Sequence, residues 1–165
     1  EVKDALEQAI RRVSTIATVH ETLSQNIAQR VVDFDSVFGR TLRLAADAAS
    51  PGFPVHIVQE GSFGEVPGDD ATHLAMVLTE LVTNAVEHGL TPLGGGTVWI
   101  KARREGDALT VTIEDNGVGM PDQPSEAGLG TQIARTFASG ELRGSIDWGR
   151  RPGGGTKAVV TANLK

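Results

Sequence analysis

The chain has 165 residues, of which 39% are hydrophobic, which is enough for one domain with a core and a short flanking element. Its formal net charge of −6 argues against nucleic acid as a direct partner, because phosphate backbones attract clustered cations, but leaves nucleotide binding open. The lack of cysteine excludes disulfides, thiolate catalysis and cysteine-based zinc sites, and no apolar run approaches the roughly 20 residues of a membrane span, so we expect a cytoplasmic domain.

Apolar residues recur at helical spacing along the first 31 residues. They are Leu6, Ala9, Ile10, Val13, Ile16, Ala17, His20, Leu23, Ile27 and Val31. This narrow seam predicts a helix that packs on a partner helix. The chain starts in helical register without Met, which suggests a piece of a longer protein. After a break at residues 33–36, a second helix is predicted over Asp35–Ala49, where Ser50-Pro51-Gly52 ends it.

Strands and helices alternate through the rest of the chain. In order, we expect strands Pro54–Gln59 and Gly61–Val66, a helix Ala71–His88 capped by residues 67–70 and ended by Gly89, strands Thr97–Arg104 and Ala108–Asp115, a loop Asn116–Gly130, a helix Thr131–Ser139, and strands Leu142–Trp148 and Thr156–Leu164. The predicted fold class is α+β, an α/β sandwich in which helices cover one face of a mixed sheet.

The predicted helix Ala71–His88 carries a polar stripe. Its polar residues, which share one side, are Glu80, Thr83, Asn84, Glu87 and His88, and its apolar residues, on the opposite side, are Leu74, Leu78, Leu81 and Ala85. A solvated face would explain many such stripes, but Asn84 is a poor helix former with no capping role there. Its carbonyl oxygen suits Mg²⁺, and Glu80, one turn earlier, could orient or deprotonate a nucleophile.

A glycine-containing turn follows directly on the strand that ends at Asp115. A strand-end Asp115 can accept hydrogen bonds from an amine such as that of adenine, while Gly117 and Gly119 let the backbone approach a flat ring. The alternative is a solvent-exposed β-turn, since Asp-Asn-Gly is also a common turn sequence.

A second glycine motif, residues 128–131, opens a helix. The free N–H groups at a helix start form an anion site suited to phosphates. No Lys or Arg lies between Asn116 and Thr131, so bound phosphates would depend on Mg²⁺, the helix N-terminus and Arg135. The third motif, Gly153–Thr156, is either a flexible hairpin or places the Thr156 hydroxyl near the base.

The order of these pieces resembles the GHKL ATPase superfamily, whose ATP-binding domain has the Bergerat fold. In its terms, residues 80–89 match the N box, 115–119 the G1 box, 128–130 the G2 box, and Thr156 the threonine near adenine. The resemblance runs from about Phe38 to Lys165 and implies binding of ATP and ADP with Mg²⁺.

Within that superfamily the chain resembles sensor histidine kinases of the HisKA_2 type, and is similar to the C-terminal part of actinobacterial PdtaS-type kinases. Residues 11–24 resemble the second helix of their dimerisation and phosphotransfer hairpin. The resemblance therefore implies a partial hairpin over residues 1–34, a GHKL catalytic domain over 35–165, a homodimeric parent, and a response regulator of the ANTAR type as partner.

The resemblance also assigns roles. Asn84 would hold Mg²⁺, Glu80 would act on the proton of the nucleophile, and Asp115 would bind the adenine amine. The glycines that would shape the pocket and its lid are Gly117, Gly119, Gly128 and Gly130, and Leu129 and Thr131 beside them would also bind ATP. Many histidine kinases have Lys three residues after the N-box Asn, where Glu87 stands here, which leaves His88 as the polar neighbour of the phosphates.

His20 is followed by Glu21, as phosphoacceptor histidines often are by an acid, and a neutral imidazole is a competent nucleophile. His20 nevertheless falls on the apolar seam, where a packed histidine is the usual finding. The resemblance places the phosphoacceptor on the preceding helix, upstream of Glu1. We therefore expect a chain that binds ATP but does not phosphorylate itself.

Two alternatives remain open from the sequence. An anti-sigma-factor serine kinase has a similar N box but gives no reason for the seam of residues 6–31. A non-catalytic GHKL module for nucleotide binding or docking would not need an intact Glu80 and Asn84.

Overall fold

The computed structural model describes residues 2–24, 31–49, 52–119 and 129–164. Within these ranges the chain forms a five-stranded sheet. Its strands, in spatial order, are β2 (Val55–Gly61), β4 (Gly96–Glu105), β5 (Ala108–Asp115), β7 (Thr156–Asn163) and β6 (Ser145–Arg150). Strand β2 runs parallel to β4 and all other neighbours are antiparallel, so the sheet is mixed as predicted.

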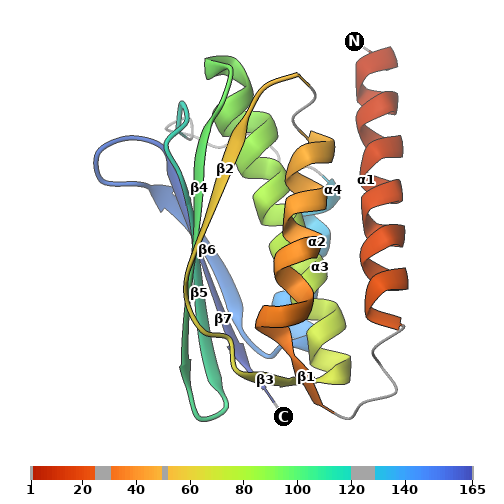
Figure 1. Ribbon diagram of the computed structural model, residues 1–165, viewed down its shortest axis with the longest axis vertical. Coiled ribbons are helices and arrows are strands. Elements are labelled where there is room, and N and C mark those ends of the chain that lie inside the picture. The colour runs from red at the N-terminus through yellow and green to blue at the C-terminus, as the bar shows by residue number, and fades with distance from the viewer. Residues whose placement is uncertain (1, 25–30, 50–51, 120–128, 165) are drawn as a thin grey trace.

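Helices lie on one face of this sheet (Figure 1). They are α2 (Phe34–Ala49), α3 (Gly68–Asn84) and α4 (Leu129–Thr136), and α1 (Val2–Ser24) lies outside them against α2 and α3. The predicted class, α+β with helices on one face of a mixed sheet after a helical segment, is confirmed. Because α3 lies between the sheet and α1, both of its sides are covered.

The core follows the alternation of the strands. In β4 the side chains of Val98, Ile100 and Ala102 are buried, whereas Lys101 and Arg103, which alternate with them, are exposed. The same period of two buries the apolar residues Leu109, Val111 and Ile113 of β5 and Ala158, Val160 and Ala162 of β7. One face of the sheet therefore belongs to the core, and the helices cover that face.

Helix α2 contributes an aromatic edge to this core. Phe34, Phe38, Leu42 and Ala46 repeat every four residues and are all buried. The ring of Phe34 lies 4.7 Å from that of Phe38 and 4.9 Å from that of Phe63. This helix matches the predicted one to within one residue at its start.

Two expectations were wrong on the N-terminal side. Val31 is not helical but opens β1 (Val31–Asp33), which pairs with β3 (Glu65–Pro67) in a separate ribbon. The predicted strand Gly61–Val66 is interrupted, because the carboxylate of Asp35 accepts hydrogen bonds from the Ser62 hydroxyl and the Phe63 amide and holds the chain in a turn. These contacts depend on the start of α2, which is distant in sequence.

The boundaries of α3 also differ from the prediction. The helix begins at Gly68, and Asp70, expected to help cap it, is buried and paired with the Arg143 guanidinium at 3.0 Å. At its other end the helix does not stop at Gly89 but continues as a π-helix over Ala85–Leu90, followed by a short 3₁₀ turn at Thr91–Leu93. The π-helix takes Gly89 into the interior, where it contacts Asp115.

The C-terminal elements shift by a few residues. Helix α4 starts at Leu129, two residues before the predicted start, and a π-helical turn over Phe137–Glu141 follows it. Strand β6 starts at Ser145 instead of Leu142, whose side chain is buried in the core. Among the described helices, none has the length and apolar character needed to cross a membrane.

Burial on both sides of α3 predicts a large cost for truncating its core side chains. Leu78→Ala should lower the free energy of unfolding by about 2–5 kcal/mol, since Leu78 is fully buried and the neighbouring helices and sheet leave it little room to collapse. Leu93→Ala is the matched control, because Leu93 is 59% exposed and should change stability by less than about 0.5 kcal/mol. Urea denaturation followed by circular dichroism measures both, and equal losses would contradict this placement of α3.

Candidate functional site

The polar stripe of α3 is not a solvated face. Helix α1 covers it, so that Glu80 and Thr83 are each only 7% exposed, and of the predicted stripe only His88 is exposed. The principal contact comes from Arg12. Its Nε donates to both carboxylate oxygens of Glu80 at 2.8 and 3.0 Å, and its Nη2 lies 3.6 Å from Oε2 of Glu87.

Burial sets the electrostatics of Glu80. Desolvation raises the pKa of this carboxyl above its ordinary value, and the charge of nearby Glu87 adds to the rise. The hydrogen bond and positive charge of Arg12 act in the opposite direction but do not cancel it. Glu80 is therefore a carboxylate of increased basicity, which is the property required of a general base near neutral pH.

Asn84 connects α3 to the start of α4. Its Oδ1 accepts a hydrogen bond from Arg12 Nη2 at 2.9 Å, and its Nδ2 donates to the Thr131 hydroxyl at 3.2 Å. Thr131 is a predicted site residue 47 positions away in sequence. Leu129 and Gly130 form the first turn of α4, while Gly128 lies outside the described residues. The structure thus brings the N-box-like helix and the G2-like turn together.

Asp115 forms a second, buried centre at the end of β5. It is 2% exposed, and its Oδ1 accepts a hydrogen bond from the Gly117 amide at 2.9 Å, while the Thr156 backbone also donates to the carboxyl group. Desolvation raises the pKa of Asp115 despite these two bonds. The carboxylate is therefore fixed by the turn that follows it and by the start of β7.

Two glycines enclose Asp115 so closely that a side chain would not fit. A Cβ atom on Gly89 would lie 2.7 Å from Oδ1 of Asp115, and one on Gly155 would lie 1.8 Å from the Asp115 carbonyl oxygen. From the sequence, Gly89 was predicted to end the helix and the N box, and Gly155 was predicted only as part of a turn. The signal was present in the Gly-Gly-Gly-Thr motif, but the partner of each glycine is far away in sequence.

A further group missed by sequence reasoning supports the turn before Thr156 from the outer face of the sheet. The guanidinium of Arg151 stacks on Trp99 at 4.3 Å from the ring centroid, and its Nε lies 3.3 Å from Glu114, which Lys101 also contacts at 2.8 Å. The Arg151 amide donates to the Gly155 carbonyl at 3.0 Å. Side chains on the outer face of the sheet thus hold the turn of residues 150–155, which Thr156 follows.

Three further predicted residues complete the account: Gly119, Arg135 and His20. Gly119 has a left-handed φ of 82°, and a Cβ atom on it would lie 3.4 Å from the Gly155 carbonyl oxygen, so the two glycine turns adjoin. Arg135, expected near phosphate, lies with its guanidinium 4.7 Å from the Trp148 ring centroid. His20 lies on α1, and its side chain is outside what the structure describes.

The oxygen atoms around Asn84 suit a metal ion whose other ligands are water molecules and nucleotide phosphates. Among the described residues there is no cluster of three or more His, Asp or Glu side chains that could hold an ion. One amide oxygen next to the Glu80 carboxylate suits Mg²⁺, which retains several waters and binds substrate phosphates. A protein-only metal cage is not what these residues provide.

The chain is similar to known proteins over nearly its whole length. The family model described as histidine kinase-, DNA gyrase B-, and HSP90-like ATPase matches residues 69–165, and a histidine kinase model, HisKA_2, matches residues 1–47. Sensor histidine kinase PdtaS of Mycobacterium tuberculosis is 42% identical over 151 residues, which is 88% of this chain and 30% of the relative. PdtaS of Mycolicibacterium smegmatis is 40% identical over 97% of this chain and 33% of the relative.

The chain thus spans about a third of the length of these relatives. Among solved structures, the histidine kinase domain from the Erythrobacter litoralis EL346 blue-light activated histidine kinase has a TM-score of 0.77, with 93% of this chain and 75% of that chain covered. The sequence identity is 24%, so this likeness is one of fold.

The contact of Gly89 with Asp115 predicts a specific defect. In Gly89→Ala the new methyl group would displace the carboxylate from its two backbone donors, and affinity for ADP should fall about tenfold or more, because a hydrogen bond to a charged group contributes roughly 1.5–3 kcal/mol. Gly140→Ala is the matched control, because a methyl group there would meet no atom within 4 Å and the backbone is helical. Calorimetric titration with ADP measures both, and equal affinities would refute the role of this contact.

Proposed function

We infer that this chain, which belongs to the family of histidine kinase-, DNA gyrase B- and HSP90-like ATPases, is the ATP-binding catalytic domain of a two-component sensor histidine kinase. For the whole protein we propose transfer of the γ-phosphoryl group of ATP to a histidine and onward to a response regulator. Consumption of ATP implies a cytoplasmic site of action. The sequence similarity to PdtaS supports a regulator of the ANTAR type as the partner.

The observation that carries the proposal is the convergence of four distant segments. The end of α3, the end of β5, the start of α4 and the start of β7 meet through the Asn84–Thr131 bond and the enclosure of Asp115. We assign the base to Asp115, together with Thr156, and the phosphates to the first turn of α4 and its preceding glycine, Gly128. Asn84 would hold Mg²⁺, which neutralises phosphate charge.

In this assignment the protein acts mainly by positioning. The imidazole nitrogen of the acceptor forms a bond to the γ-phosphorus as the bond to the β–γ bridging oxygen breaks, and ADP leaves. Glu80 accepts or orients the proton of the other ring nitrogen. Burial raises the pKa of this carboxyl, which makes it a better proton acceptor. The buried Asp115 keeps the nucleotide in register with Glu80 by fixing the adenine edge.

The dimeric state of the parent is also a proposal. Leu6, Ile10 and Val13 of α1 are 60%, 58% and 67% exposed, although they form the seam predicted from the sequence. Helix α1 turns this seam away from α2 and α3 and contacts α3 through Gln8 and Arg12 instead. A partner helix that covers the seam would bury these side chains, as expected of a dimerisation hairpin.

Nucleotide binding by the chain itself tests the site. Asn84→Ala should remove the dependence of ADP affinity on Mg²⁺, because the amide oxygen is lost. Asp115→Asn should weaken ADP binding about tenfold or more, because an amide cannot accept from the amine and both backbone donors in the same way. Asp107→Asn, in the exposed turn after β4, is the charge-matched control. If calorimetry finds unchanged affinity in both site variants, the assignment is wrong.

The chemical stability of the phosphorylated product tests the reaction. The full-length protein incubated with labelled ATP should acquire phosphate that acid removes and base does not, because phosphohistidine is acid-labile. An acid-stable product would favour the serine kinase instead, and no product from a folded protein would favour the non-catalytic module. The chain of residues 1–165 alone should remain unlabelled. Acid-labile label on it that disappears in His20→Gln would identify His20 as the acceptor.

A further inference from the structure

One turn of α1 occupies the polar atoms of α3 that matter most for the proposed function. Arg12 donates to both oxygens of Glu80 and to Oδ1 of Asn84, and Gln8, one turn earlier on α1, donates to Oε2 of Glu87. Glu80, Asn84 and Glu87 thus each face a donor from α1. The only cation among these donors is the guanidinium of Arg12, within the described part of the chain.

The guanidinium of Arg12 contacts the amide oxygen that the proposed function assigns to Mg²⁺. It has five donors and no acceptor, it is positively charged, and it lies 2.8 Å from Glu80 and 2.9 Å from the amide oxygen of Asn84. Mg²⁺ coordinated by the same oxygen would approach it even more closely. Two cations so near each other in a site where Glu80 is 7% exposed repel strongly, because little water screens them.

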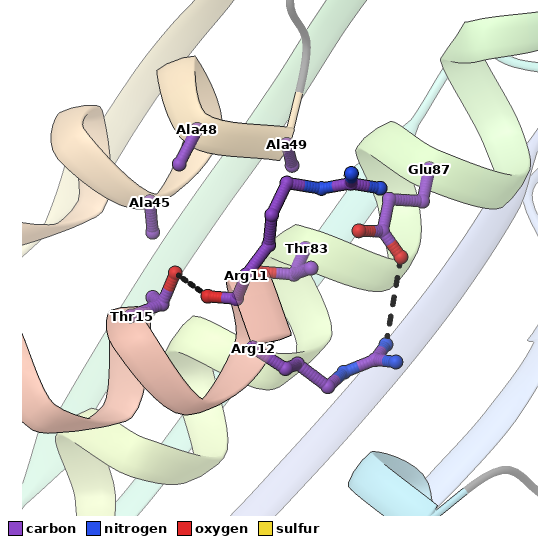
Figure 2. Close-up of a pocket in the computed structure, with 8 residues that line it drawn as sticks. All are labelled: Arg11, Arg12, Thr15, Ala45, Ala48, Ala49, Thr83 and Glu87. Atoms are coloured by element: carbon purple, nitrogen blue, oxygen red, sulfur yellow. Dashed lines mark hydrogen bonds and ion pairs between the residues drawn. The ribbon is translucent and has the colours of Figure 1, made fainter. Parts of the chain in front are cut away.

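The large apolar side chains of α1 contribute little to its contact with α2 and α3. Between α1, α2 and α3 lies a small crevice, open to solvent, that Arg11 and Arg12 line (Figure 2). Its other lining is short or polar: Thr15, Ala45, Ala48, Ala49, Thr83 and Glu87. The large apolar residues Leu6, Ile10 and Val13 of α1 face solvent. Polar contacts centred on Arg12, more than apolar burial, therefore hold α1 against α3.

We propose that Arg12 is an internal competitor of Mg²⁺, so that α1 docked on α3 and a magnesium nucleotide bound at Asn84 exclude each other. The inference rests on the proposed function, because it requires Asn84 to be the magnesium ligand. Docked α1 keeps Glu80 paired and the metal position filled, which is an autoinhibited state. Loading of the nucleotide releases Arg12, and release of α1 in turn increases affinity for Mg²⁺–ADP, since the coupling is reciprocal.

Arg12→Leu tests the competition. This variant should bind ADP about 5- to 50-fold more tightly than the wild type in Mg²⁺, and the difference should largely disappear when EDTA removes the metal. Arg11→Leu is the matched control, because Arg11 lines the same crevice and is exposed, and it should leave affinity unchanged. Arg12→Lys keeps the charge but loses the planar fork, so its affinity for Mg²⁺–ADP should lie between those of the wild type and Arg12→Leu. Calorimetric titration measures all four proteins.

The position of α1 provides a readout that does not depend on activity. The chain has no cysteine, so Val13→Cys and Leu44→Cys, at exposed positions on α1 and α2, accept a pair of spin labels specifically. Mg²⁺–ADP should lengthen and broaden the distance distribution of the labelled wild type. In the Arg12→Leu background the distribution should be broad with or without the nucleotide.

The outcomes separate the two proposals. Equal or weaker Mg²⁺–ADP binding by Arg12→Leu, or a label distance that Mg²⁺–ADP leaves unchanged, would overturn the competition while the nucleotide site stands. Weaker binding would show that Arg12 helps to hold the nucleotide. Absence of Mg²⁺–ADP binding in the wild type and in both Arg12 variants would overturn the proposed function and the competition with it. If Arg12→Leu does not fold, the ADP affinities of Arg12→Lys and Arg11→Leu in Mg²⁺ are compared instead. Tighter binding by Arg12→Lys supports the competition, and equal or weaker binding overturns it.

Discussion

The structure depends on keeping two carboxylates inside the protein, Glu80 on α3 and Asp115 at the end of β5. Desolvation disfavours the charged form of both and raises both pKa values, so each carboxylate needs hydrogen-bond donors around it. Asp115 receives backbone amides, which are fixed parts of the chain. Glu80 receives the guanidinium of Arg12, which belongs to a separate helix. The Asp115 carboxylate is thus held by fixed parts of its own domain, whereas in the proposed competition the Glu80 carboxylate loses its partner when α1 leaves.

The surroundings of Asp115 require close backbone contact between segments that meet only in the folded state. Gly89 is brought to Asp115 by the π-helix that extends α3, and Gly155 by the turn that Arg151 anchors on Trp99. The extra residue per turn of a π-helix is rare in ordinary helices and is often found at functional sites. Here it has a direct geometric consequence, because a regular helix that ended at Gly89 would not place this residue against the carboxylate.

These contacts also explain how much the sequence could predict. The alternation of β4 and β5 and the four-residue repeat of α2 are local patterns, and they predicted the sheet and the helical face to within a few residues. Asn84 and Asp115 stood out because each conflicts with its local context, a poor helix former in mid-helix and a carboxylate at the end of an apolar strand. Arg12, which lies 72 residues from Asn84, gave no such signal, since an arginine on an amphipathic helix is normally solvated. The β1–β3 ribbon was missed for the same reason, because its pairing exists only in the folded chain.

Helix α1 has two faces with separate uses. At about 100° per residue, Leu6, Ile10 and Val13 lie on roughly the opposite side from Gln8, Arg12 and Thr15. The exposed fractions agree, since the first three are exposed and the second three are partly buried. A partner helix on the apolar face would therefore leave the polar contacts with α3 in place, so assembly alone does not release Arg12. Anything that separates α1 from α3 has to act on this polar face, where Arg12 contacts the oxygen atoms of Asn84 and Glu80. In the proposed competition, the charged and polar groups on α3 therefore decide whether α1 stays bound to it. A partner helix on Leu6, Ile10 and Val13 would meanwhile keep α1 in the dimer.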